Sequence, residues 1–513
     1  MKATPRTRTP ERQRPARTRY DAVVVGAGIA GLTATALLAH AGLRVLLLEA
    51  MHYPGGCASS FHKGEGVFDI GATTFGGTAP GQPLHSLFTI IGDFDELLPA
   101  KPAMGIAMDG ALLLRHDDPA RWHADCDAMF SISSASFWTE VRSFSDAAYA
   151  LLEALPWLPP SNPKELFDDV RHMPRSILRH LPAALGTVAS RLRAHGLRDS
   201  RFHDFIDAQL LITSQSSADR VPFLAGALGL SYADYPVYAV RGGMLRYARF
   251  LEERARAFGA EILYLQPVTQ LRQQHVGWEV RTATDCVVTA DVVVSAIPVF
   301  NLPGITSGAV SRHYTRLCDK LSRRIRPLWG AITMYGIVAE ELVADLPLNV
   351  QVILPQVLAS CGSRTLFCSL SHPDDTERAP AGYRTMTIST HIDVRRPETA
   401  WSGDMYRSWK AMLASDIQKA LRTHVPALRE LAFAQSHVGT PRTFVKYTRR
   451  HAGLVGGIPL DKAVFPLRYP RNTTPFPGLY LLGDTAFPGQ GLPGVTLGAL
   501  TVHKRLKVGH EIQ

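Results

Sequence analysis

The chain has 513 residues, of which 46% are hydrophobic and 19% are charged. This length exceeds one domain of roughly 100–200 residues, and the composition can supply a large core, which excludes a wholly disordered or collagen-like protein. The formal net charge of +10 is concentrated in two basic patches, residues 1–19 and 171–198, so the rest of the chain is close to neutral. The charge balance therefore does not by itself indicate a nucleic-acid-binding protein.

The first residues predict an arm without regular structure. Residues 1–19 contain seven Lys or Arg and one Glu among prolines and threonines, with no hydrophobic periodicity. This composition is typical of a disordered basic tail. A solubilising role and attraction to an anionic membrane both fit the arm, whereas nucleic-acid binding fits less well because no aromatic side chains accompany the arginines. We expect ordered structure to begin near Tyr20.

An uncharged run over residues 22–41 has the hydropathy of a transmembrane helix or a signal peptide. The run contains three glycines at G-x-G-x-x-G spacing, which neither kind of segment needs, and an apolar stretch ending at Glu49 follows it. The pattern predicts a strand at 22–25, a helix at 31–41 and a strand at 45–49, forming a βαβ unit that is buried on both faces. We therefore expect no membrane span.

The glycines of this unit predict a dinucleotide site. Gly26 allows the tight turn after the strand, Gly28 lets a pyrophosphate approach the helix N-terminus, and Gly31 lets the helix pack closely on the strand. Glu49 closes the second strand, where an acid accepts hydrogen bonds from the ribose hydroxyls. These residues predict a bound dinucleotide without separating NAD from FAD.

The remaining pattern predicts an α/β protein with a discontinuous Rossmann-type cofactor domain and an inserted mixed α+β substrate domain. A largely helical stretch follows the first unit, and apolar strands return at 261–265, 291–297 and 478–482. These separated α/β pieces must meet in one sheet, so the second domain is inserted twice. The predicted boundaries are a basic arm at 1–19, cofactor-domain segments at 20–95, 236–300 and 441–513, and substrate-domain segments at 96–235 and 301–440.

Motifs after Glu49 separate the two cofactors. They are Pro54-Gly55-Gly56-Cys57, Phe68-Asp69-Ile70-Gly71, Arg241-Gly242-Gly243, an apolar strand at 290–296 and Leu481-Leu482-Gly483-Asp484. With these motifs the sequence resembles the FAD-dependent amine-oxidase and phytoene-desaturase superfamily. The resemblance covers residues 20–77, 238–300 and 478–503, and it implies FAD as the cofactor.

The resemblance also implies which residues hold FAD. Val268 meets the adenine through its backbone, and Asp484 holds the ribityl and pyrophosphate region. The implied set is Gly26, Gly28, Ile29, Ala30, Gly31, Glu49, Ala50, Gly55, Gly56, Cys57, Ala58, Val268, Gly483, Asp484, Gln490, Gly491 and Leu492. The family often has arginine after the double glycine. Cys57 here removes that potential phosphate contact and leaves the backbone amides of Gly56 and Ala58.

A C-terminal motif, Phe487-Pro488-Gly489-Gln490-Gly491, resembles the signature of carotenoid desaturases and carotenoid isomerases. It is more similar to isomerases and late-pathway desaturases than to phytoene desaturase. The implied function is an FAD-dependent oxidoreductase that desaturates or cis/trans-isomerises a carotenoid or a related long isoprenoid polyene. An isoprenoid saturase stays open because Cys57 also fits retinol-saturase relatives. An amine oxidase and a non-catalytic isoprenoid-binding flavoprotein are further alternatives.

The basic stretch at 171–198 interleaves arginines with Ile177, Leu178, Val188 and Leu192. This composition fits an interfacial helix on anionic lipid, and it also fits a helical hairpin whose apolar face packs on the core. A polyene must be collected from a bilayer, so we expect a helical membrane-facing region and a cytoplasmic, peripherally membrane-associated protein.

The catalytic groups are less defined than the cofactor site. Flavin-dependent desaturation needs mainly orientation, and Asp207 and Tyr235 are candidates for an acid or a base, although structural roles fit both residues. No second G-x-G-x-x-G follows a strand, which argues against a separate NAD(P)H site. The flavin then exchanges electrons with oxygen, a quinone or another protein, or the reaction is redox-neutral overall; oxygen or a quinone is the expected acceptor. The six cysteines have neither C-x-x-C pairs nor zinc-type histidine spacing, and we expect no metal.

Overall fold

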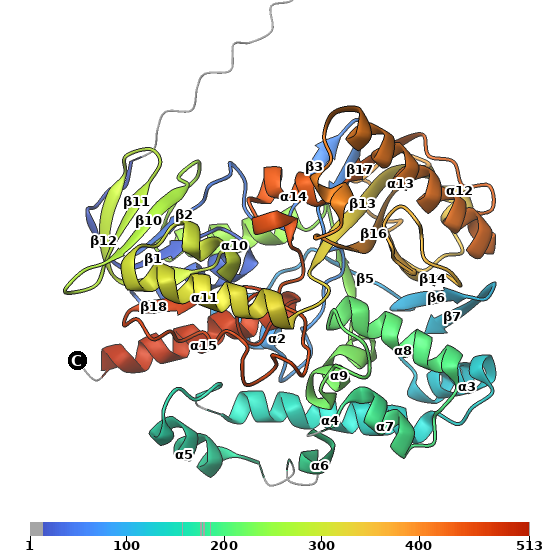
Figure 1. The fold of residues 1–513 in the computed structure, drawn as a ribbon, viewed down its shortest axis with the longest axis horizontal. Helices are drawn as coiled ribbons and strands as arrows, with labels where there is room; N and C mark the ends of the chain where they lie inside the picture. The colour runs from blue at the N-terminus through green and yellow to red at the C-terminus, as the bar shows by residue number, and fades with distance from the viewer. Residues whose placement is uncertain (1–13, 156, 175–176, 178–179, 185, 512–513) are drawn as a thin grey trace, which may run out of the picture.

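The computed structural model describes residues 14–155, 157–174, 177, 180–184 and 186–511. One of its two seven-stranded sheets is built on the N-terminal βαβ unit (Figure 1). Its strands are β1 (Arg19–Val25), β2 (Val45–Leu48), β9 (Glu261–Leu263), β10 (Val268–Gln273), β11 (Trp278–Thr282), β12 (Val287–Ser295) and β18 (Leu479–Leu481). The neighbours β18, β12, β1, β2 and β9 run parallel. The glycine turn after β1 therefore lies at the carboxyl edge, where open α/β sheets bind ligands.

Helices cover both faces of this sheet. The helices α1 (Ile29–His40), α2 (Pro83–Ile91), α10 (Leu245–Ala257) and α15 (Leu492–Glu511) share one core with Val24 of β1. Val23 and Val25, the neighbours of Val24 in β1, point to the other face of the sheet. They belong to a second core, which also contains side chains of α11 (Gly308–Arg324). Every residue of α1 from Ile29 to Ala39 is buried, which explains why this segment reads as one continuous apolar run.

A second sheet stands beside the first, in the order β17-β13-β16-β15-β14-β6-β7 (Figure 1). Its strands are β6 (Met104–Met108), β7 (Ala111–Arg115), β13 (Trp329–Ala339), β14 (Asn349–Ile353), β15 (Thr365–Leu370), β16 (Tyr383–Asp393) and β17 (Gln435–Gly439). The helix α13 (Gly403–His424) packs on it through Trp409, Leu413 and Ile417, and the short α12 (Glu340–Val343) lies nearby. The two strands β6 and β7 correct the expectation of a mainly helical segment. All residues of β6 are buried, so β6 lacks the alternation that identifies a strand.

The helices between β7 and β8 (Tyr238–Val240) lie below the two sheets in Figure 1. They are α3 (Pro119–Phe130), α4 (Ala135–Ala154), α5 (Pro163–His172), α6 (Leu181–Ala184), α7 (Val188–Ala194), α8 (Ser200–Thr213) and α9 (Phe223–Leu230). Of these, α3 and α8 lie below the second sheet and α5 lies below α15. All of these helices except α5 contribute to one core that is rich in aromatic rings, including the edge-to-face pair of Trp122 and Trp138. The mixed α/β architecture predicted from the sequence is thus the observed one.

The basic stretch at 171–198 is divided among the end of α5, α6 and α7, so a single interfacial helix over this stretch is wrong. Val188 and Leu192 of α7 are buried in the core, and Arg191 forms an ion pair with Glu140 at 2.7 Å. These contacts favour the alternative of a helix packed on the core. Leu178 lies outside the described residues.

Short elements complete the chain: β3 (Ser60–Lys63), β4 (Gly66–Asp69), β5 (Leu97–Pro99), β8 (Tyr238–Val240), α14 (Pro441–Thr448), and the 3-10 turns η2 (Tyr232–Asp234), η3 (Val299–Gly304), η4 (Pro397–Ala400), η5 (Pro426–Leu428) and η6 (His451–Gly453). Contacts between the N-terminal segment and the first sheet begin before Tyr20, the expected start of ordered structure, because the Ala16 N–H donates to Glu261 at 2.9 Å. Residues 1–13 of the basic arm lie outside the described residues, and the domain boundaries stay a prediction. Among the described helices, none combines the length and apolarity that crossing a bilayer requires.

Candidate functional site

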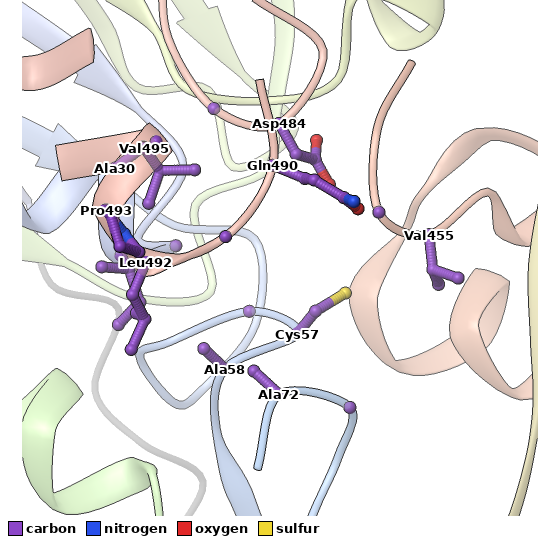
Figure 2. A pocket seen from close by; sticks show the side chains of 18 of the residues that line it. Ala30, Cys57, Ala58, Ala72, Val455, Asp484, Gln490, Leu492, Pro493 and Val495 are labelled. Carbon is purple, nitrogen blue, oxygen red and sulfur yellow. The ribbon is translucent and has the colours of Figure 1, made fainter. Parts of the chain in front are cut away.

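A cavity of about 1030 Å³ lies at the carboxyl edge of the first sheet and continues between the two sheets and the helices below them. Its volume is at the upper limit of the roughly 300–1,000 Å³ usual for ligand pockets. Residues from the N-terminal glycine turn, the second sheet, α4, α9 and the start of α15 all line it. Figure 2 shows Cys57 and Ala58 facing Asp484 and Gln490 across this space. The cavity can therefore hold two molecules side by side or one long ligand.

The three glycines of the turn, Gly26, Gly28 and Gly31, have different surroundings. A Cβ built on Gly31 would lie 2.0 Å from the Gly26 carbonyl oxygen, so helix α1 can approach the turn only without a side chain there. Gly26 has a φ of +101°, which favours glycine. A Cβ on Gly28, by contrast, meets nothing within 4 Å, and Gly28 lines the cavity. This open space at the N-terminus of α1 fits a pyrophosphate.

Glu49 follows β2 and also lines the cavity. Its Oε2 accepts from the Ala27 N–H at 2.6 Å, and its Oε1 accepts from the Met51 N–H at 2.7 Å. Burial raises the pKa of Glu49, although these backbone donors counteract the shift. The two bonds fix the carboxylate beside the glycine turn, which is the position that a ribose-binding acid needs.

Most of the residues that the resemblance implied for FAD are brought together here. Gly26, Gly28, Ile29, Ala30, Glu49, Ala50, Gly55, Gly56, Cys57, Ala58, Val268, Gly483, Asp484, Gln490, Gly491 and Leu492 line this one cavity. Gly31 supports it from within the helix. A Cβ on Gly56 would lie 3.4 Å from the Gly28 Cα, so the double glycine lies against the turn. Segments from Gly26 to Leu492, far apart in sequence, thus line one cavity, and the assignment of each contact to FAD stays a prediction.

A second set of lining residues is mainly apolar. It comprises Ala148, Leu151 and Leu152 of α4, Leu224, Ala225 and Leu228 of α9, Leu366 and Phe367 of β15, and Leu460, Phe465 and Phe487. The two sets meet where the Gln490 amide donates to the Ile212 carbonyl at 3.1 Å. We call the space enclosed by the second set the apolar chamber. Such a lining suits a hydrophobic substrate.

The two candidates for acid or base differ in position. Tyr235 lines the cavity, but its hydroxyl donates to Asp146 at 2.6 Å and burial raises its pKa. Asp207 lines a different hollow of about 280 Å³, where it accepts from the Ala218 N–H at 2.6 Å. The structure therefore does not bring Asp207 into the apolar chamber.

Among the described residues no group of three His, Cys, Asp or Glu is placed to hold a metal.

Three cavity residues were not anticipated from the sequence. Arg450 lies beside Cys57 and Asp484, and His391 and Gln215 line the cavity from β16 and the end of α8. Within the described residues, the buried Gln215 Oε1 has no hydrogen-bond partner, while its amide donates to the Val455 carbonyl at 3.0 Å. No local motif marks these residues, because their neighbours in space are distant in sequence.

His391 makes a pH-dependent contribution to stability. Burial lowers its pKa to about 4, whereas an unfolded histidine titrates near about 6.5. Between these pH values only the unfolded chain binds the proton, so this stabilising contribution is complete above about pH 6.5 and falls by about 3 kcal/mol as the pH drops to 4. Urea unfolding at pH 7 and pH 4.5 should give a smaller loss for His391→Gln than for the wild type. Equal losses in both proteins would contradict this prediction.

Residues 29–333 match the family described as flavin containing amine oxidoreductase, and the chain belongs to that family. The resemblance predicted from the motifs is thereby confirmed, and the family implies a flavin cofactor.

Individual proteins are similar to this chain over nearly its whole length. The chain is 26% identical to the chloroplastic prolycopene isomerase of Arabidopsis thaliana, over 94% of this chain and 82% of that protein. It is 22% identical to a 4,4'-diapolycopene oxygenase of Methylomonas sp, over 94% of this chain and 97% of that protein. A solved oxidoreductase from Methanosarcina mazei has the same fold, with a TM-score of 0.63, 17% identity, and coverage of 94% and 99% of the two chains. The chain is thus a distant relative of enzymes named for carotenoids.

Proposed function

We propose that this protein is an FAD-dependent enzyme that cis/trans-isomerises or desaturates a carotenoid or a related long isoprenoid polyene. The observation that carries the proposal is the single cavity, which joins the dinucleotide turn to the apolar chamber. Flavin chemistry requires direct contact between the cofactor and the reacting bond, and one continuous cavity allows that contact.

The chain's own residues account for binding of FAD. The backbone N–H groups at the start of α1 hold the pyrophosphate, Glu49 holds the adenosine ribose, and Asp484 holds the ribityl region. The start of α15 at Leu492 lines the same cavity and presents the positive end of a helix dipole. When bound, FAD supplies exchange of a hydride or an electron with the substrate.

The apolar chamber orients the polyene and excludes water. Leu224 and Leu228 lie four residues apart on α9 and present one apolar face to it. His391, which lines the same cavity, is neutral at pH 7 because burial lowers its pKa to about 4, so it adds no charge there. An apolar lining suits isomerisation, which needs rotation about a double bond and no permanent acid or base. The likeness to a prolycopene isomerase supports this choice.

Desaturation is the second candidate, and it requires oxygen or a quinone as the electron acceptor. Expression in a carotenoid-accumulating bacterium, followed by extraction of the pigments, separates the two reactions. An unchanged mass with a changed retention time indicates an isomerase, whereas loss of hydrogen with a red-shifted spectrum indicates a desaturase. No change across several polyenes would contradict both.

We also propose that the membrane contact is made by α5. Leu166, Phe167 and Val170 expose 53%, 62% and 56% of their surface on this helix. The helix is attached to the turn at 157–160, because Asp169 accepts from the Trp157 N–H at 2.8 Å. Leu158 and Pro159 of that turn line the cavity. The helix that carries the exposed apolar side chains is thus attached to a turn of the cavity wall, where a lipid-dissolved substrate would enter.

Replacing Leu166, Phe167 and Val170 together by serine should lower co-sedimentation with anionic liposomes by more than about tenfold, since each buried apolar side chain contributes roughly 1.5–3 kcal/mol. The matched control replaces Val276, Val357 and Met405, which are exposed by 74%, 56% and 58% on other elements. Equal binding of the two triple variants would rule out α5 as the membrane contact.

A further inference from the structure

Arg450 lines the cavity from a backbone turn that contains left-handed residues. It lies between Arg449 and Ala452, whose φ angles of +53° and +51° are left-handed. A Cβ on the nearby Gly453 would lie 2.2 Å from the Pro441 carbonyl oxygen, so this turn is pinned against the start of α14. Left-handed non-glycine residues are uncommon and persist where the surroundings hold them. The fold therefore fixes the direction of Arg450.

The guanidinium of Arg450 is almost fully enclosed, with 11% of the side chain exposed. It donates to Asp484 Oδ2 at 2.6 Å and to the Leu454 carbonyl, and the Cys57 side chain lies beside it. Burial by itself lowers the pKa of Arg450, but Asp484 and Cys57 outweigh burial and raise it. A guanidinium has five N–H donors, which is more than these two acceptors use.

A buried ion pair of one arginine and one carboxylate adds little to the stability of a fold, because both charged groups lose their hydrating water. Arg450 also lines the cavity next to Cys57, the residue after the double glycine, and Gly56 lies against Gly28 at the start of α1. The cation thus lies in the cavity that the glycine turn also lines, next to the residue that follows the double glycine. Arginine is well suited to phosphate because its planar fork can donate two parallel hydrogen bonds.

We infer that Arg450 binds the pyrophosphate of FAD, supplying from the segment after α14 the positive charge that Cys57 lacks. This inference rests on the proposed function, because it assumes that FAD occupies the cavity. Asp484 then acts as a positioning residue that holds the guanidinium toward the phosphates. The exposed Arg449 also lines the cavity, on the side of Glu49, whose pKa it lowers against the effect of burial.

The test is titration of the full-length protein, freed of flavin, with FAD, ADP and adenosine. Arg450→Met should weaken binding of FAD and of ADP by roughly 10- to 100-fold and leave adenosine binding unchanged, because adenosine has no pyrophosphate. Arg442→Met, an exposed arginine on α14 that does not line the cavity, is the control and should bind like the wild type.

A second-site variant separates a lost contact from a damaged fold. Cys57→Arg added to Arg450→Met places an arginine beside the same space, and it should restore most of the affinity for FAD and ADP. Unchanged FAD and ADP affinity in a folded Arg450→Met would overturn the inference, and so would a double variant that folds but is not rescued. A wild-type protein that binds no FAD would instead contradict the proposed function, which keeps the two failures distinct.

Discussion

Gly28→Val is expected to give a folded protein that retains no flavin. The added Cβ meets no protein atom within 4 Å, so the chain should tolerate it. The valine methyl groups would instead occupy the space in front of the α1 N-terminus, where the pyrophosphate must approach the backbone. Absorbance of the purified protein near the flavin bands, together with its thermal unfolding, measures both effects.

Two further glycines make this experiment specific. Gly304→Val is the matched control, because Gly304 is exposed and a Cβ there also meets nothing within 4 Å. It should keep both the fold and the flavin. Gly31→Val should lose the fold itself, since its Cβ would lie 2.0 Å from the Gly26 oxygen. A Gly28→Val protein that retained full flavin would contradict the assignment of the turn.

Leu228→Trp is expected to abolish conversion of the polyene while leaving flavin occupancy unchanged. Leu228 lies on α9 and lines the apolar chamber, so the larger ring would fill space that the substrate needs. Displacing a substrate from its reactive position by even about 1 Å can cost roughly 100-fold in rate, and a filled chamber should cost at least that. Product formation per bound flavin is the quantity to compare.

Val276→Trp provides the control for this substitution, because Val276 is 74% exposed on a loop of the first sheet. It should convert the polyene at the wild-type rate. If Leu228→Trp bound flavin and also converted the polyene normally, the substrate would have to lie outside the apolar chamber. That result would separate the cofactor site from the proposed substrate site.

The part of the fold that local sequence identifies is the βαβ unit. Gly26, Gly28 and Gly31 follow β1, and Glu49 follows β2, because the turn and the sheet edge impose these residue types within a few positions. The motif around Gly483 and Asp484 was instead implied by the family resemblance. It lines the same cavity, although its strand joins the sheet from the far end of the chain.

Other features depend on contacts that no local pattern records. The second sheet takes β6 from a segment rich in helices, and the fully buried β6 lacks strand alternation. The basic stretch at 171–198 reads as an amphipathic surface helix, yet Val188 and Leu192 are buried by packing with α9 and its neighbours. Arg450 is 393 residues from Cys57, so only the folded chain reveals their contact.

The central claim is that FAD bound in this cavity acts on a polyene in the apolar chamber. The most direct test incubates purified, flavin-loaded protein with a single poly-cis carotene in the absence of oxygen, with the flavin either oxidised or chemically reduced. Chromatography and mass spectrometry then follow the carotene, and Gly28→Val serves as the flavin-free control. The account predicts a new geometric isomer of unchanged mass with the reduced flavin and none with Gly28→Val. No conversion by the flavin-loaded wild type in either oxidation state, or equal conversion by Gly28→Val, would contradict it.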